Sequence, residues 1–296
     1  MAGVDRSWRR RAEPELNGHT AVSRGSAAPA QHRVVFDHPT RTIATAAGIC
    51  AALLLPAACG SSGGSSAPAT EATEATAPVI DPGDGGHYTP RVDPADFVAT
   101  IDNRYFPLRP GSRWEYEGVS DGEPERDVVV VTNDRHPVMG VSTVVVRDTV
   151  SRGGQVVEDT RDWYAQDRAG NVWYFGEAVQ SFKHGQLEST DGSFEAGVGG
   201  ALPGIVMPAH PIVGHAYRQE YLKGEAEDMG QIVQTDAHTD VPLGAFDAVV
   251  VTRDWNPLEP DVIEQKRYAP GVGVVMETTE AGGSDTSSLV AFSPGT

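Results

Sequence analysis

The stretch QVVEDTRDWYAQDRAGNVWYFGE, residues 155–177, contains two runs of β-branched and aromatic residues separated by a short polar segment. Such runs are typical of β-strands. The segment between them supplies Asp167 and Gly170-Asn171, and tight hairpin turns prefer these residue types. The stretch therefore predicts a β-hairpin with its turn at residues 167–171.

Similar runs continue through most of the chain, divided by glycine, proline, asparagine and aspartate. They include RWEYEG, DVVVVTND, STVVVRDTV, FDAVVVTRD, IEQKRYA and GVVMETTE, between residues 113 and 280. Strand-like runs spaced by about 8–12 residues indicate an all-β domain with hairpin connections. Because a sheet of many strands curls or closes, we expect one large curved antiparallel sheet or a half-barrel. The segment DPADFVATI predicts one short helix that starts at Asp93 as its N-cap.

Landmark residues of the first half of this domain recur in the second half at a nearly constant offset. Two glycines and one tyrosine recur after 103 or 104 residues: Gly111 and Gly214, Gly140 and Gly244, and Tyr164 and Tyr268. A constant offset predicts two duplicated four-strand units. The alternative is a plain antiparallel meander, which also places glycine in turns and aromatic residues in strands.

An apolar run at residues 43–58 precedes Cys59 and the polar segment GSSGGSS. The run is shorter than the roughly 20 residues that a membrane-spanning helix needs, and it suits the core of a signal peptide. The end of the run, LLLPAAC, resembles a bacterial lipobox. That resemblance implies cleavage before Cys59 and attachment of acyl chains such as palmitate to its sulfur. A soluble secreted protein cut near Ala58 is the alternative.

These features divide the chain into three parts. Residues 1–58 comprise an N-terminal extension and the lipoprotein signal peptide, and the extension is long enough that we expect translation to begin nearer Val34 or Val35. Residues 59–92 are rich in Gly, Ser, Ala, Thr and Pro, which predicts a disordered tether. Residues 93–294 form the all-β domain. The expected location is the cell envelope, at the outer face of the cytoplasmic membrane.

The chain is acidic, with 41 acidic against 23 basic residues and a formal net charge of −18. Seven arginines and four acidic residues precede Cys59, so the part from Cys59 onward has a net charge of −21. This acidity excludes nucleic acid as a partner and excludes charge-driven adhesion to anionic lipid. Membrane attachment must then come from the acyl chains on Cys59. We expect a monomer whose protein or small-molecule partner is unknown.

Ligand-type side chains are densest in VMPAHPIVGHAYRQEYLKGEAEDMG, residues 206–230. Histidine with carboxylate suits zinc, and histidine with methionine suits copper. The two histidines are five residues apart, a spacing that does not bring them to the same face of a helix or of a strand. The alternative is therefore that both are exposed turn residues, and no cofactor is predicted. The candidate metal ligands are Met207, His210, His215, Glu220 and Met229.

The first strand of the opening stretch alternates acidic with aromatic residues. Asp159, Arg161 and Trp163 share one face, and Asp162 and Tyr164 share the other. Asp159, Asp162 and Trp163 are therefore candidates for a cleft with general acid–base chemistry. The alternative is that Asp159 and Arg161 are cross-strand charge partners on a solvated face.

Two segments resemble the opening and closing motifs of a group of uncharacterised secreted bacterial all-β lipoproteins. IDNRYFPLRPGSRWEYEG, residues 101–118, resembles the opening pattern D-N-x-Y-F-P-L-x-P-G-x-x-W-x-Y, and YAPGVGVVMET, residues 268–278, resembles the closing turn. The resemblance implies export and an all-β fold, and it carries over no activity and no site residue. An excess of arginine over lysine, 20 to 3, fits an actinobacterial origin.

We therefore expect a lipid-anchored extracytoplasmic lipoprotein with a non-catalytic β-rich domain that binds a ligand or has a structural role. No nucleophile elbow, P-loop or zinc-protease motif indicates an enzyme. One alternative is an extracytoplasmic metal- or carboxylate-dependent hydrolase, which would bring His210, His215, Glu220 or the Asp159–Asp162 pair into one pocket. The other is a carrier of an apolar ligand, with a tryptophan- and valine-lined concave sheet. The aromatic residues that would form either a core or a cleft are Trp114, Trp163, Trp173, Tyr174, Phe175 and Trp255.

Overall fold

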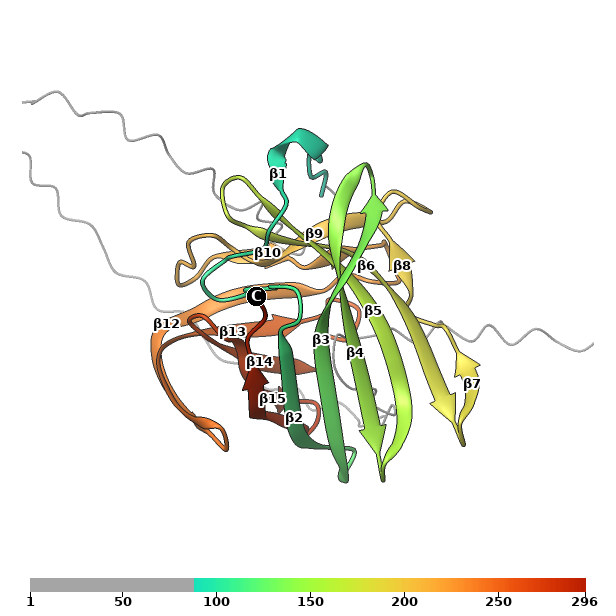
Figure 1. The fold of residues 1–296 in the computed structure, drawn as a ribbon, viewed down its shortest axis with the longest axis vertical. Coiled ribbons are helices and arrows are strands. Elements are labelled where there is room, and N and C mark those ends of the chain that lie inside the picture. The colour runs from blue at the N-terminus through green and yellow to red at the C-terminus, as the bar shows by residue number, and fades with distance from the viewer. Residues whose placement is uncertain (1–87) are drawn as a thin grey trace, which may run out of the picture.

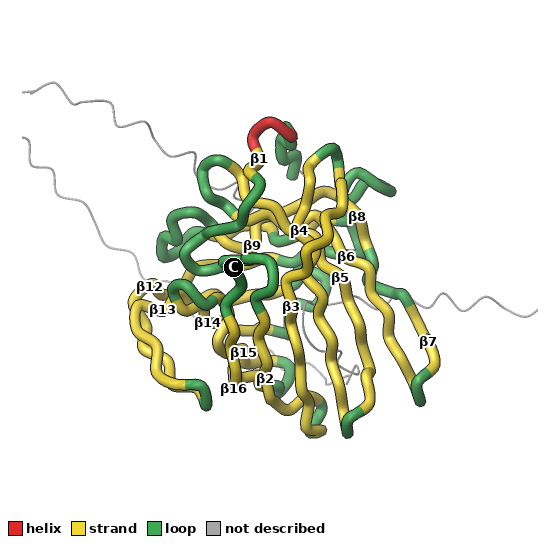
Figure 2. Tube along the Cα trace, viewed as in Figure 1, coloured by secondary structure: helices red, strands yellow, loops and turns green. Residues whose placement is uncertain are grey.

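A computed structural model describes residues 88–296 as one antiparallel sheet with a single short 3-10 turn (Figures 1 and 2). The predicted signal peptide, the lipidation candidate Cys59 and all but the last few residues of the predicted tether lie outside the described residues. Among residues 88–296, no helix has the length and apolar character to cross a membrane.

The strands vary from 2 to 16 residues in length. The elements are η1 (Pro94–Asp96), β1 (Phe97–Val98), β2 (Arg113–Ser120), β3 (Glu123–Val138), β4 (Val141–Arg152), β5 (Gln155–Asp167), β6 (Val172–Lys183), β7 (Gln186–Ser189), β8 (Phe194–Glu195), β9 (Leu202–Met207), β10 (Ala216–Arg218), β11 (Glu220–Tyr221), β12 (Met229–Val241), β13 (Gly244–Trp255), β14 (Ile263–Ala269), β15 (Gly273–Ala281) and β16 (Thr286–Ser293).

The sheet is nearly closed into a barrel. Its strands follow the order β10-β12-β13-β14-β15-β16-β2-β3-β4-β5-β6-β9-β11. At one edge β10 pairs with β12, and directly afterwards in the chain β11 pairs with β9 at the other edge. A single short segment of chain thus joins the two edges. The prediction of a single large curved antiparallel sheet is confirmed.

The predicted hairpin joins β5 to β6. Asp167 Oδ1 accepts a hydrogen bond from Asn171 N at 2.9 Å, which closes the turn. Gly170 has φ +95°, a conformation that residues with a side chain rarely adopt. The turn chemistry read from the sequence is therefore what forms the hairpin.

The predicted helix is shorter than the segment that indicated it. Asp93 is the N-cap, and its side chain accepts a hydrogen bond from Ala95 N at 3.0 Å. The helix ends after one 3-10 turn, η1, because the following residues Phe97 and Val98 pair with β5 as strand β1. Sheet pairing thus takes over residues for which helix was predicted.

The landmarks of the predicted duplication fall at equivalent places in the strand order. Gly140 and Gly244 lie at the β3–β4 and β12–β13 turns, and Tyr164 and Tyr268 are buried on β5 and β14. The runs β2–β6 and β10, β12–β15 are both antiparallel meanders, joined in the sheet through β16. This order fits a repeated meander, and each run has five strands in place of the predicted four.

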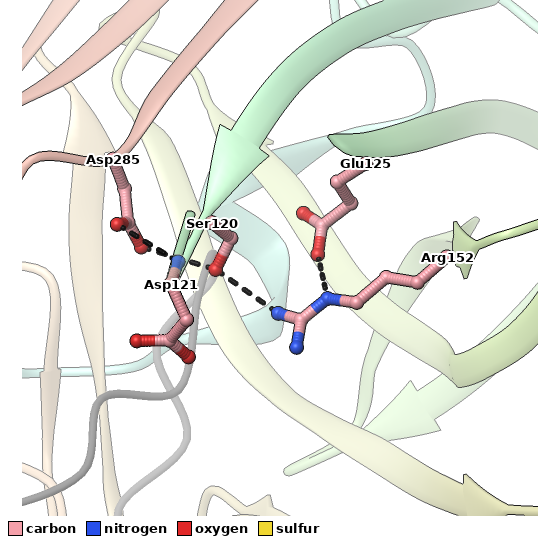
Figure 3. Close-up of polar contacts among 5 residues, drawn as sticks. All are labelled: Ser120, Asp121, Glu125, Arg152 and Asp285. Atoms are coloured by element: carbon pink, nitrogen blue, oxygen red, sulfur yellow. Dashed lines mark hydrogen bonds and ion pairs between the residues drawn. The ribbon is translucent and has the colours of Figure 1, made fainter. Parts of the chain in front are cut away.

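A polar network ties strand ends together at one end of the barrel (Figure 3). Asp285, in the β15–β16 turn, accepts hydrogen bonds from Ser120 Oγ at 3.1 Å and from Asp121 N at 3.3 Å. Arg152, at the end of β4, donates to Ser120 Oγ at 3.0 Å and to Glu125 Oε2 at 2.7 Å. Burial raises the pKa of Glu125, and the nearby Arg152 opposes that shift. The network links β2, β3, β4 and the turn before β16.

Candidate functional site

The barrel contains a partly open cavity of about 150 Å³. One part of its lining is aromatic and aliphatic, with Phe106, Leu108, Trp114, Tyr116, Val129, Val146, Tyr164, Tyr174, Val206, Met229, Trp255, Val262, Tyr268 and Val274. The other part is charged, with eight carboxyl groups and one lysine among the described lining residues: Asp127, Asp148, Asp162, Glu220, Asp228, Asp254, Glu264, Glu277 and Lys266. A concave, largely apolar cavity with a few converging polar groups is typical of small-molecule sites.

The segment before β2 supplies part of the apolar lining, and Asn103 holds it in place. Asn103 is buried, and its Nδ2 donates to Gly170 O at 2.9 Å and to Pro208 O at 3.3 Å. Its Oδ1 accepts hydrogen bonds from Tyr105 N at 2.8 Å and Phe106 N at 3.2 Å. These bonds fix the backbone that presents Phe106 to the cavity.

The two motifs that carried the lipoprotein resemblance meet at this cavity. Trp114 Nε1 donates to Val272 O at 2.8 Å, and Tyr116 Oη donates to Val274 O at 3.0 Å. The side chains of Trp114 and Tyr116 belong to the opening motif, and the two carbonyls belong to the closing one. These two hydrogen bonds hold the opening segment against the closing turn, and the rings of Trp114 and Tyr116 line the cavity.

The carboxyl groups of β3, β4 and β5 form one side of the charged lining, which we call the acid layer: Asp127, Asp148 and Asp162. Asp127 on β3 and Asp148 on β4 are diagonal neighbours in the sheet, because Asp148 pairs with Val129, two residues from Asp127. Burial and the neighbouring Asp127 raise the pKa of Asp148 well above its usual value. Burial also raises the pKa of Asp127, to about 6. Two neighbouring carboxyl groups do not readily ionise together, so this pair loses its protons in two separate steps.

Asp162 is held by the aromatic wall. It lies on β5 directly opposite Glu177 on β6, and its Oδ1 accepts a hydrogen bond from Tyr174 Oη at 2.9 Å. Burial, then the nearby Asp148, raises the pKa of Asp162 well above its usual value. The carboxyl groups of the acid layer therefore retain their protons to higher pH than free carboxyl groups do.

The other side of the charged lining already contains a cation. Lys266 Nζ on β14 lies 3.4 Å from Asp254 Oδ2 and 3.8 Å from Glu277 Oε1. Burial lowers the pKa of Lys266, but the carboxylates Glu277 and Asp254 outweigh burial and hold that pKa well above its usual value. This lysine stays charged inside the barrel because carboxylates surround it.

The three cleft candidates do not meet in one cleft. Asp162 lines the cavity, whereas Asp159 and Trp163 do not. Asp159 Oδ1 accepts a hydrogen bond from Arg147 Nε at 2.9 Å, so its charge partner lies across the strand pair, on β4. Trp163 stacks on His136, with ring centroids 4.2 Å apart. Asp159 and Asp162 thus belong to opposite faces of β5 and do not form a carboxylate pair.

The candidate metal ligands are divided in the same way. Glu220 and Met229 line the cavity, whereas Met207, His210 and His215 do not. His210 is exposed in the loop after β9, and Met207 is fully buried in the core. Within residues 88–296, no group of three histidine, cysteine, aspartate or glutamate side chains is placed to hold a metal ion.

Two of the three residues of the acid layer, Asp127 and Asp148, were not among the candidates predicted from the sequence. A signal for them was present, because each lies two residues from a valine that lines the cavity, Val129 and Val146. Residues two apart on a strand face the same side of the sheet. Acidic residues in phase with buried apolar residues on neighbouring strands therefore indicate a charged interior.

Comparison with known proteins gives two distant structural neighbours. No family model matches the chain, and no curated protein matches it significantly. A Bacteroides fragilis protein, proposed to be exported and with a YmcC-like fold, is 16% identical, with a TM-score of 0.40 over 65% of this chain and 100% of that one. A Parabacteroides distasonis protein, proposed to be a lipoprotein, is 11% identical, with a TM-score of 0.35 over 64% and 99%. Similarity at this level carries no argument about function.

Proposed function

We propose that the protein is a lipid-anchored extracytoplasmic binding protein that holds a small molecule inside its barrel and catalyses no reaction. The observation that supports this most directly is the cavity of about 150 Å³ with an aromatic wall. A cavity of roughly this volume in an apolar core takes up benzene, so the barrel has room for a compound with one ring.

The lining favours binding over the catalytic alternative. The histidines that a metal-dependent hydrolase would use, His210 and His215, lie outside the cavity. The lining also differs from that of a carrier for purely apolar ligands, because eight carboxyl groups face the cavity alongside the aromatic residues. A ligand with both an apolar body and a polar group fits both parts of this wall.

Filling the cavity is expected to abolish binding. Val146 lies on the cavity wall in the middle of β4, and Val146→Phe places a ring in the space that a ligand would occupy. The measurement is quenching of intrinsic tryptophan fluorescence, to which Trp114 and Trp255 in the lining contribute, by benzylammonium, benzyl alcohol and benzoate. At least one of the three is expected to bind the wild-type protein, and none is expected to bind Val146→Phe.

The matched control is Val156→Phe, the same substitution at an exposed position on β5. This variant is expected to bind like the wild-type protein. Melting curves for both variants show whether each folds, since extra core volume costs about 1–3 kcal/mol. Absence of binding by all three compounds to the wild-type protein, or unchanged binding by Val146→Phe, contradicts a ligand site in the barrel.

Membrane anchoring is expected to depend on Cys59 alone. The chain has two cysteines, Cys50 and Cys59, and small residues directly precede only the second. Cys59→Ser removes the sulfur that would carry the acyl chain, so the protein is expected to leave the membrane fraction of its host. Cys50→Ser is the control and is expected to stay membrane-bound. Release of Cys50→Ser, or retention of Cys59→Ser, contradicts anchoring through Cys59.

A further inference from the structure

The carboxyl groups around the cavity fall into two sets that differ in their partners. On β13–β15 the carboxylates of Asp254 and Glu277 surround the ammonium group of Lys266. On β3–β5, no basic side chain among the described residues forms an ion pair with Asp127, Asp148 or Asp162, although all three line the cavity. The β13–β15 side of the cavity thus contains a cation, Lys266, whereas the carboxyl groups on the β3–β5 side have no cation beside them among the described residues.

Several carboxylate oxygens in the lining are buried without a hydrogen-bond donor. Oδ1 of Asp127, Oδ1 of Asp148 and Oδ1 of Asp254 have no partner among the described residues. Each of these oxygens is buried, and Asp254 as a whole is only 5% exposed. A buried polar atom without a partner costs free energy, and a ligand that donates hydrogen bonds removes this cost.

We propose that the cavity binds a small organic cation, with an ammonium group among the carboxyl groups of the acid layer and a one-ring body against the aromatic wall. This rests on the proposed function of the barrel as a ligand site. An ammonium group has three hydrogen-bond donors and a positive charge. It can therefore donate to the unpartnered Oδ1 atoms of Asp127 and Asp148. Aromatic faces such as those of Trp114 and Tyr164 also attract cations.

The geometry favours this occupant over the other classes of ligand. An anion would lie beside carboxyl groups that already repel one another. A neutral compound gains nothing from the negative charge on the acid layer. A metal ion needs several ligands within one coordination sphere, and no such group of three occurs in residues 88–296.

The test is calorimetric titration of the whole protein with benzylammonium, benzyl alcohol and benzoate, which differ mainly in charge. Benzylammonium is expected to bind at least about tenfold more tightly than benzyl alcohol, and benzoate is expected not to bind. Asp148→Asn is expected to weaken benzylammonium about 10–100-fold and to leave benzyl alcohol within about twofold. Asp127→Asn is the second variant, for use if the first does not fold. The control is Asp134→Asn, at an exposed position on β3.

Repeating the titration at pH 5 and pH 8 adds a second readout. Asp148 faces Asp127, Glu125, Asp162 and Glu158, and these acidic neighbours help it retain a proton. An ammonium group must displace that proton, so benzylammonium is expected to bind more tightly at pH 8, whereas benzyl alcohol is expected to show little change.

The outcomes separate this proposal from the one on which it depends. Binding of none of the three compounds contradicts the ligand site itself. Equal binding of benzyl alcohol and benzylammonium, or unchanged benzylammonium affinity in both Asp148→Asn and Asp127→Asn, keeps the ligand site and overturns the assignment to an organic cation. Competition by calcium at equal concentration also overturns it, in favour of a metal ion.

Discussion

Arg218→Met is expected to lower the free energy of unfolding by about 3–5 kcal/mol, the cost of removing one partner from a buried ion pair. Arg218 has 0% exposure, and its NH1 lies 3.7 Å from Glu227 Oε2. Its guanidinium also lies 4.4 Å from the ring centroid of Tyr221, over the face of the ring. The substitution leaves the buried carboxylate of Glu227 without this charge partner. Chemical denaturation followed by tryptophan fluorescence measures the change.

The position of Arg218 explains why the effect is large. It is the last residue of β10, next to the segment that passes to β11 and joins the two edges of the sheet. The control is Arg91→Met, because Arg91 pairs with Asp93 while 84% of its side chain is exposed. That variant is expected to change stability by less than about 0.5 kcal/mol. Adding Glu227→Gln to Arg218→Met is expected to restore part of the loss, since it removes the unpaired charge. Equal effects of Arg218→Met and Arg91→Met contradict this account.

The free energy of unfolding is expected to fall as the pH rises from 5 to 8, by about 3 kcal/mol or more. Folding raises the pKa of Asp127 from 3.8 to about 6, and burial raises those of Asp148, Asp162, Glu177 and Glu220 well above their usual values. The folded state therefore binds more protons than the unfolded chain in this range. Stability from these groups is complete below about pH 4 and is lost as the pH rises through their folded pKa values, first that of Asp127.

Asp148→Asn isolates one contributor to this pH dependence. The amide keeps the size of the carboxyl group but no longer titrates, so the slope of stability against pH is expected to fall by up to about 1.4 kcal/mol per pH unit. Asp134→Asn, exposed on β3, is expected to leave the slope unchanged. Denaturant unfolding at several pH values gives the slopes. Stability that rises between pH 5 and pH 8 contradicts a protonated acid layer.

Local features of the fold followed from the sequence because short-range chemistry determines them. Asp167 and Gly170 form the predicted hairpin turn, and alternation on β5 correctly placed Asp159 and Asp162 on opposite faces. The curvature of the sheet followed from the number of strands. The near-closure of the sheet could not be predicted in this way. It depends on β10 pairing with β12 and β11 pairing with β9, and these two short strands contribute only five paired residues.

The cavity could be predicted only in part. Trp114, Tyr174 and Trp255 were predicted to line either a core or a cleft, and the structure places them in the cavity wall. Acidic residues such as Asp127 and Asp148 were not candidates, because a carboxylate in a strand usually faces water. Their burial follows from contacts between strands that lie far apart in the sequence. The pairing of Asp159 with Arg147 on the neighbouring strand β4 was not predicted either, because the sequence does not show the register between two strands.

The most direct test of a cation-binding barrel is a crystal structure of the protein soaked with 4-bromobenzylammonium, with the anomalous signal of bromine recorded. The account predicts one strong bromine peak inside the barrel beside Trp114 and Tyr164, with the ammonium nitrogen within hydrogen-bond distance of Asp127 or Asp148. Bromine found only on the outer surface, or a barrel interior that the compound does not enter, would contradict it.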